Sequence, residues 1–584
     1  MKHFFKTVLG AFVGTLLALV ALVFILVGIF GTVASNSKSE PSATSKNTIL
    51  KIDLSTPVAE QASESFSFDI MSGSADYVSS IALFDAVRAI DAAAEDPAVK
   101  FIYLVGCDMM QTTVSHMEEL REALVRFRSS GKAIISYSKN LTIGSYYLAS
   151  VADKVILNTY GECMFEGLSA SVMYYKDLID KLGVDVQLIR HGKYKSAGEP
   201  YIRSDMSQEN REQYEVMLGT MWDTVLEGAA SSRNFTKEEL AGWIDSLKIG
   251  SAADAMAMGL VDELWFDDEV DEYLCSVFDV KDVKKLKFTE LPEYAAAKLK
   301  PDGKIRDKVA ILYAQGEIIT GEGQDGTMGE DFVEEISKLR RDSSVKAVVF
   351  RVNSPGGAVQ TSAEIEREIA LLRQVKPVVA SYGDYAASGG YWISCGCDKI
   401  FSDRTTLTGS IGVFGMIPSF GRAISKNLHV NIYEVSTTKH GSLGGGFQPL
   451  DNDEVAWVQA MIERTYDDFV TRVSKGRDIP EERVDAIAQG RVWAGGDALN
   501  IGLVDEIGGL QEAVRYAAVA AGLDTYRTVE YPVVKTLVEK ITESFSKKGP
   551  GARAGVPSVE TSGEWLKTVS RPAVMARMDN VIVK

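Results

Sequence analysis

Short apolar runs alternate with amphipathic segments along most of this chain. Residues 345–352 (VKAVVFRV) and 377–382 (PVVASY) have the pattern of buried strands. Between them, residues 362–375 repeat their apolar positions with a helical period, which predicts a helix capped by Ser362. Strands that alternate with helices in this way are typical of βαβ units around a largely parallel sheet. The pattern therefore predicts an α/β fold.

The same pattern occurs twice along the chain. The segment AEDPAVKFIYLVG at 94–106 matches RRDSSVKAVVFRV at 340–352. Further on, Asp153 aligns with Asp398 and Gly259 with Gly502, so the offset stays close to about 245 residues. A unit this long that is present only twice is a duplicated domain rather than a solenoid.

Composition changes divide the chain into five parts. The two copies are expected at 47–285 and 305–526, and the polar, proline-containing residues 286–304 are expected to join them. Residues 1–37 form the N-terminal segment, and residues 527–584 form a C-terminal extension that contains a Gly/Pro/Ser-rich stretch.

The N-terminal segment has the pattern of a membrane span. No residue from Thr7 to Ser37 is charged, and nearly all of them are apolar. A span needs about 20 apolar residues, whereas the core of a cleaved signal peptide has about 7–15, so we expect a retained transmembrane helix. Residues 32–34 (TVA) leave cleavage open as an alternative. Lys2 and Lys6 precede the span, which predicts a cytoplasmic N-terminus with the bulk of the chain outside, in the periplasm of a Gram-negative bacterium.

Charge and composition exclude several classes of ligand. The net charge is −18 and there is no long basic run, so nucleic acid is a poor candidate partner. The five cysteines fit no zinc spacing, and none of the five histidines lies in a metal-binding pattern. We therefore expect no metal and no cofactor.

Three glycine-bearing loops follow predicted strands of the second copy, at 353–357, 386–390 and 407–412. The amides of Gly356 and Gly357 could form an oxyanion hole, although such a loop is also an ordinary strand-to-helix turn. The other two loops hold serines, Ser388 and Ser410, between small residues. Either serine could reach a substrate carbonyl.

A serine nucleophile needs a base, and none of the three loops contains a histidine. A lysine can serve if burial lowers its pKa and leaves it neutral. Lys195, after the apolar run 184–189, and Lys439, in the matching segment of the second copy, are both candidates. A hydroxyl of Ser436 or Thr437 could orient the amine.

Four motifs together resemble the long, duplicated form of bacterial signal peptide peptidase, also called protease IV. They are GKYKSAGEP at 192–200, NSPGG at 353–357, YAASGGYW at 385–392 and TGSIGVFG at 408–415. The resemblance covers nearly the whole chain. It implies a membrane-bound serine–lysine protease built from two tandem crotonase-like, caseinolytic-protease-like α/β copies and assembled as a bowl-shaped homotetramer.

By this resemblance the nucleophile is Ser410 and the general base is Lys195. The base then comes from the first copy and the nucleophile from the second. The first copy carries Phe165 or Glu166 where the serine would be, and the second copy lacks the YKSA motif. Only a site composed from both copies is complete.

The function that follows is an endopeptidase of the bacterial inner membrane that degrades signal peptides released after export and other short apolar peptides. One alternative is an acyl-CoA enzyme of the crotonase type, which the predicted location outside the cytoplasm disfavours. Another is a membrane-tethered scaffold without activity, which the presence of both Ser410 and Lys195 disfavours.

Overall fold

The computed structural model describes residues 47–69, 74–106, 112–323, 326–534 and 574–577, with a few isolated positions besides. The predicted span from Thr7 to Ser37 lies outside these continuous ranges. Among the residues that are described, no helix is both long enough and apolar enough to cross a bilayer.

The first copy is built on a six-stranded parallel sheet with the order β12-β9-β7-β6-β1-β13. Helices α2 (Leu83–Glu95), α3 (Val114–Ser129) and α4 (Ile143–Ala149) pack their apolar faces on it. The strands, in chain order, are β1 (Thr48–Asp53), β6 (Val99–Val105), β7 (Ala133–Ser138), β9 (Lys154–Leu157), β12 (Glu263–Leu264) and β13 (Phe288–Glu290).

The second copy repeats this sheet strand for strand. Its parallel strands run in the order β24-β20-β19-β17-β14-β25, so the two copies share both strand order and direction. The predicted duplication of an α/β unit is confirmed. The strands are β14 (Lys308–Gln315), β17 (Val345–Ser354), β19 (Val378–Ala387), β20 (Lys399–Ser402), β24 (Glu506–Ile507) and β25 (Arg527–Tyr531).

Each sheet continues beyond the boundary expected from composition. The segment 286–304, expected to be a linker, contains β13, which pairs with β1, and helix α11 (Leu291–Lys298). Its Pro292 stands in the first turn of α11, where a missing N–H costs nothing. In the same way β25 lies past residue 526 and pairs with β14. Proline and polar residues therefore mark a helix start and an edge strand here rather than a free linker.

The predicted strands at 345–352 and 377–382 are confirmed as the central strands β17 and β19. The helix between them, α13 (Val359–Arg373), begins earlier than predicted, with Ala358 at its N-cap. Ser362 lies inside the first turn, where its Oγ donates to the carbonyl oxygen of Ala358 at 2.8 Å. A serine whose hydroxyl bonds to the carbonyl four residues earlier in the helix cannot be told from an N-cap serine by sequence pattern.

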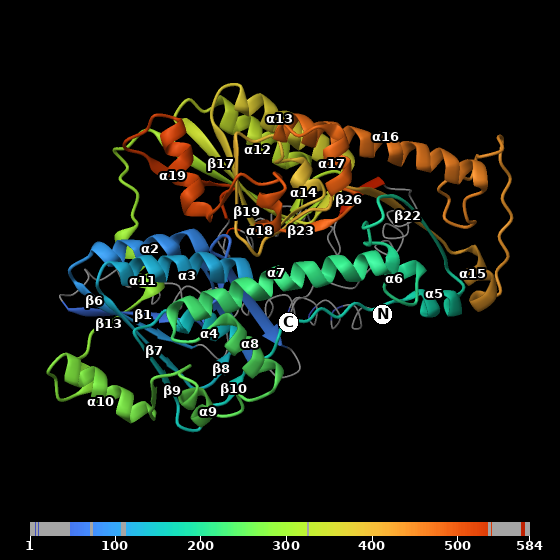
Figure 1. Cartoon of the computed structure of the whole chain (residues 1–584). Coiled ribbons are helices and arrows are strands. Elements are labelled where there is room, and N and C mark those ends of the chain that lie inside the picture. The colour runs from blue at the N-terminus through green and yellow to red at the C-terminus, as the bar shows by residue number, and fades with distance from the viewer. Residues whose placement is uncertain are drawn as a thin grey trace.

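A third sheet joins the two copies. Strand β11 (Asp185–His191) of the first copy pairs along its whole length with β22 (Val413–Ser419) of the second, antiparallel, from Asp185 opposite Ser419 to His191 opposite Val413. Figure 1 shows the result: α5 (Lys176–Leu182) and α6 (Glu199–Ile202) of the first copy lie beside β22 and α15 (Gly421–Leu428) of the second. Helix α7 (Gln208–Ser232) runs back from there between the copies.

A buried ionic cluster forms a second junction between the copies. Arg351 on β17 is fully buried and pairs with Glu60, at 2.8 Å, and with Glu119 on α3, at 2.9 Å. His116 Nε2 lies 3.2 Å from the same Glu60. Burial by itself would raise the pKa of Glu60, but the Arg351 charge and the His116 hydrogen bond lower it to about 2. The cluster thus holds a charged glutamate of the first copy against the second copy.

Replacing Arg351 with leucine should strongly destabilise the chain, because two buried carboxylates would lose their common partner. The expected loss is about 3–5 kcal/mol of unfolding free energy, measured by urea titration of the detergent-solubilised full chain. Arg515→Leu is the matched control, since Arg515 pairs with Asp91 at the surface, and its cost should be about 1 kcal/mol or less. Equal losses in the two variants would contradict this account of the junction.

Candidate active site

The pairing of β11 with β22 brings the residues after β11 beside the residues before β22. His191 is opposite Val413, so the turn that follows His191 lies next to residues 410–412. The chain turns at Gly192, where φ is 106° and a Cβ would approach the Gln489 carbonyl carbon to 2.5 Å. Only glycine fits this turn. Arg190 closes it by donating to the carbonyl oxygen of Lys195 at 2.5 Å.

Lys195 is buried and its amine lies between two serines of the second copy. The side chain is 1 % exposed. Nζ lies 3.0 Å from Ser410 Oγ, 2.8 Å from Ser388 Oγ and 2.9 Å from the carbonyl oxygen of Ser410. The structure thus brings together Lys195 and Ser410, the two residues that the sequence singled out from different copies.

Both serines have backbone conformations that non-glycine residues rarely adopt. Ser410 has a φ of 50° and follows Gly409, whose φ is 77°. Ser388 has a φ of 55° and a ψ of −115°. Each conformation costs on the order of 1–3 kcal/mol and persists only where the surroundings impose it, which is common at active sites. Here the amide of Ser388 donates to the Gly409 carbonyl oxygen at 2.8 Å, which ties the two loops together.

The segment around Gly490 supports the site, and the sequence analysis missed it. The amide of Gly490 donates to the carbonyl oxygen of Ile411 at 2.8 Å, and the amide of Ser410 donates to that of Arg491 at 2.7 Å. A Cβ at Gly490 would lie 2.6 Å from Lys195 Cβ. The only signal in the sequence was a glycine between an amphipathic segment and a strand pattern that begins near Val492. In the structure these two segments are α17 (Glu481–Ile487) and β23 (Val492–Ala494).

The predicted oxyanion loop lies against Gly389, the residue that follows Ser388. Gly356 and Gly357 belong to β18 (Gly356–Ala358), and a Cβ on Gly389 would come within 3.0 Å of both. The amide of Gly356 donates to Ser354 Oγ within its own loop, at 3.2 Å. The oxyanion role of the two glycines stays a prediction.

The two corresponding positions in the first copy carry no serine. Strand β10 (Cys163–Met164) pairs with β8 (Leu141–Thr142) as β21 (Leu407–Gly409) pairs with the end of β19. This correspondence puts Ile143 where the second copy has Ser388, and Phe165 where it has Ser410. Both side chains are buried. The first copy therefore has a packed apolar core at the position of the second copy's serines.

The alternative base, Lys439, lies at the surface. Its amine pairs with Asp453 at the start of α16 (Asn452–Arg477), and its side chain is 65 % exposed. Ser436 and Thr437 are exposed as well. The hydroxyl that contacts the Lys195 amine beside Ser410 is therefore that of Ser388, and the suggestion of Ser436 or Thr437 is wrong.

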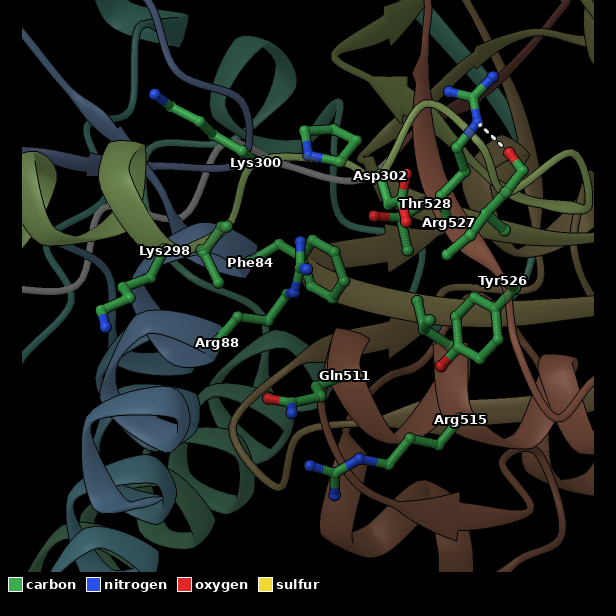
Figure 2. A pocket seen from close by; sticks show the side chains of 14 residues that line it. Phe84, Arg88, Lys298, Lys300, Asp302, Gln511, Arg515, Tyr526, Arg527 and Thr528 are labelled. Carbon is green, nitrogen blue, oxygen red and sulfur yellow. Dashed lines mark hydrogen bonds between the residues drawn. The ribbon is translucent and has the colours of Figure 1, made fainter. Parts of the chain in front are cut away.

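A cavity of about 330 Å³ lies elsewhere, at the junction between α2 of the first copy and the end of the second (Figure 2). Several basic side chains line it, but Lys298 pairs with Asp96 at 2.8 Å and Arg515 with Asp91 at 3.4 Å. None of the residues around Lys195 borders this cavity. It is a gap between the copies and carries none of the chemistry described above.

Comparison with known families agrees with the repeat. The sequence model of peptidase family S49 matches the chain twice, at residues 126–280 and 370–524, once within each predicted copy. The chain belongs to peptidase family S49. Membership of this peptidase family confirms the prediction of a serine protease, and it contradicts the alternative of an acyl-CoA enzyme.

Curated relatives of the S49 chain span most of its length. Protease 4 of Haemophilus influenzae is 38 % identical over 455 residues, which cover 75 % of this chain and 72 % of the relative. Protease 4 of Salmonella typhi is 34 % identical over 540 residues, with 90 % and 86 % covered. Serine protease SPPA of the Arabidopsis thaliana chloroplast is 31 % identical over 504 residues, with 84 % and 73 % covered. The resemblance to the long form of the signal peptide peptidase family is confirmed.

Gly490→Ala should impair peptide hydrolysis while leaving Lys195 and both serines in the sequence. The added methyl group would displace the Lys195 backbone, and a shift of about 1 Å at a reacting group can cost about 10²-fold in turnover. Gly259→Ala is the matched control, because Gly259 has a similar φ of 72° but no atom within 4 Å of the new Cβ. We expect the control to lose about 1–2 kcal/mol of stability and little kcat/KM. A similar loss of kcat/KM in both variants would contradict the packing argument.

Proposed function

We propose that this chain is a membrane-anchored serine endopeptidase in which Ser410 is the nucleophile and Lys195 the general base. Its substrates would be signal peptides released after protein export and other short apolar peptides. The observation that carries the proposal is the buried Lys195 amine, 3.0 Å from Ser410 Oγ. The names of the relatives, Protease 4 and Serine protease SPPA, support the reaction class.

The proposed mechanism needs a neutral amine at Lys195. Burial disfavours the charged form of a lysine, so the site favours the free base. Lys195 takes the proton of Ser410 as Oγ attacks the peptide carbonyl, and an acyl-enzyme and a leaving amine form when the C–N bond breaks. Lys195 returns the proton to the leaving amine. A water molecule, deprotonated by the same amine, then hydrolyses the ester.

Ser388 has a positioning role in this proposal. Its Oγ lies 2.8 Å from Nζ and can hold the amine toward Ser410 through the cycle. Ser388 is also the rival nucleophile, since the same amine contacts both hydroxyls. Ser410 is favoured because it lies three residues before β22, the strand beside which an extended peptide can lie.

The strand pairings of the third sheet support a binding site for an extended peptide. Strand β26 (Val574–Arg577), near the C-terminus, lies antiparallel to both of its neighbours, β22 and β18. An extended chain is thus accommodated between the strand that follows Ser410 and the strand that holds Gly356 and Gly357. Strand addition of this kind satisfies the backbone of any extended peptide and leaves selection to side-chain pockets. We expect those pockets to prefer small or aliphatic side chains.

Location and assembly complete the proposal. Residues 7–37 would anchor the chain once in the bacterial inner membrane, with the protease outside the cytoplasm. Each copy would be crotonase-like, and four chains would form a bowl that admits short unfolded peptides and excludes folded proteins. Rapid cleavage of a folded protein with few loops by the intact oligomer would contradict this arrangement.

Alanine variants separate the roles of the three residues at the site. Ser410→Ala and Lys195→Ala should abolish peptide hydrolysis with the fold intact, whereas Ser388→Ala should retain partial activity because it removes only a partner of the amine. Labelling with a fluorophosphonate probe and peptide mapping should place the adduct on Ser410 and show none in Ser410→Ala.

Lys439→Ala is the matched lysine control, since its amine is engaged at the surface, and it should hydrolyse peptides as the unaltered chain does. Full activity of Ser410→Ala together with loss in Ser388→Ala would reassign the nucleophile.

Removal of β26 should make short peptides bind more tightly. In the proposed site β26 occupies the slot that a substrate strand would take, so a chain that ends at residue 570 should show a several-fold lower KM with kcat little changed. Ala576→Pro should act in the same direction without shortening the chain, because Ala576 pairs with Gly357 and proline removes a backbone donor. An unchanged or higher KM in both variants would contradict a shared slot.

A further inference from the structure

His191, the last residue of β11, contacts helix α16 of the second copy through a ring nitrogen and through the face of its ring. Nδ1 lies 2.5 Å from Glu463 Oε2, and since an ionised carboxylate only accepts, the ring donates this hydrogen bond. The ring stacks on Tyr466, with centroids 3.6 Å apart and planes 18° from parallel. Glu463 and Tyr466 are three residues apart on α16 and therefore lie on one face of the helix. The two contacts together fix the position and the tilt of the imidazole.

The end of β11 needs an anchor of this kind. In the sheet that the described residues form, β11 is an edge strand, paired with β22 on one side. The ends of such elements open locally at a small cost in free energy. Lys195 follows His191 by four residues, so any movement at His191 passes directly into the turn that carries the amine.

Tyr466 is connected to a second point of the same turn through its hydroxyl. Burial raises the pKa of Tyr466, so the hydroxyl stays protonated and donates to Asp485 Oδ1 at 2.5 Å. The hydroxyl accepts from Gln489 Nε2 at 3.2 Å. Gln489 has a φ of 54°, which a non-glycine residue keeps only where its surroundings impose it, and its carbonyl oxygen accepts the amide of Tyr194 at 2.9 Å. Tyr466 thus supports, through Gln489, the residue directly before Lys195.

We propose that His191 and Tyr466 are positioning residues that hold the Lys195 amine at hydrogen-bond distance from Ser410. His191 holds the start of the turn, and Tyr466, through Gln489, holds the residue before the amine. The proposal rests on the function given above, in which Lys195 is the base, and it deepens that function without adding a step to the reaction.

The order of the strands separates an effect on the base from an effect on substrate binding. The slot proposed for the peptide lies at the edge of β22 that faces β26, whereas His191 belongs to β11, at the opposite edge of β22. A displaced turn should therefore move the amine and leave the slot unchanged. Loss of positioning then lowers kcat alone, whereas damage to the slot would raise KM.

Kinetics of the detergent-solubilised full chain on a short fluorogenic peptide test the proposal. His191→Ala should lower kcat about tenfold or more with KM unchanged, because misplacing a reacting group by about 1 Å can cost about 10²-fold. His191→Asn places an amide donor near the position of Nδ1, and it should recover part of the lost kcat. Tyr466→Phe, which keeps the ring stack and removes the hydroxyl, should also lower kcat alone.

Gln187→Ala is the matched control. Gln187 lies on the same face of β11, four residues before His191, and exchanges two hydrogen bonds with the backbone of Leu450, just before α16. The variant removes a comparable contact between strand and helix at the end of β11 that is remote in sequence from Lys195. Its midpoint of urea unfolding should fall, whereas its kcat should match that of the unaltered chain.

An unchanged kcat in either His191→Ala or Tyr466→Phe would overturn the proposal, as would an equal loss of kcat in Gln187→Ala. Should His191→Ala fail to fold by circular dichroism, Tyr466→Phe and His191→Asn carry the same test. Lys195→Ala, assayed in parallel, separates the two claims. Hydrolysis retained in Lys195→Ala would overturn the assignment of the base, whereas an inactive Lys195→Ala beside a fully active His191→Ala would overturn the positioning role alone.

Discussion

The antiparallel pairing of β11 with β22 is the contact on which the rest of this molecule depends. It fixes the position of the Gly192 turn, the turn fixes Lys195, and Lys195 meets two serines that belong to the other copy. The hydrogen bonds of a strand pair set register to a single residue, and a slip by one would turn every side chain to the opposite face. The two α/β sheets position the loops, but the seven-residue pairing of β11 with β22 determines whether these loops come together in one site.

Much of the architecture could be predicted from the sequence, because its signals are local or periodic. The buried strands β17 and β19 and the helix between them followed from apolar spacing, and the duplication followed from aligned residues such as Asp153 and Asp398. The boundaries of the two copies were harder to predict from the sequence. Strand β13 is short and lies at the sheet edge beside β1, so its polar composition resembles that of a linker.

The residues that support the site could not be predicted from the sequence, because they depend on contacts between distant segments. Such contacts leave no periodic pattern in the sequence. The role of Ser388 beside Lys195 arises from a left-handed backbone that brings two loops together. Gly490 matters only because a neighbouring segment passes within van der Waals distance of its Cα. Lys439 was a reasonable alternative from alignment alone, and only the different path of the second copy's segment takes it to the surface.

The division of the proposed site between the copies also determines when that site can form during synthesis. The Lys195 amine and the Ser410 hydroxyl are 215 residues apart in the chain. At about 5–20 residues per second, roughly 10–40 s of synthesis separate the two groups. Throughout that interval the emerging chain contains the proposed base but not the proposed nucleophile. Under the proposed assignment, the site therefore stays incomplete until most of the chain has been synthesised.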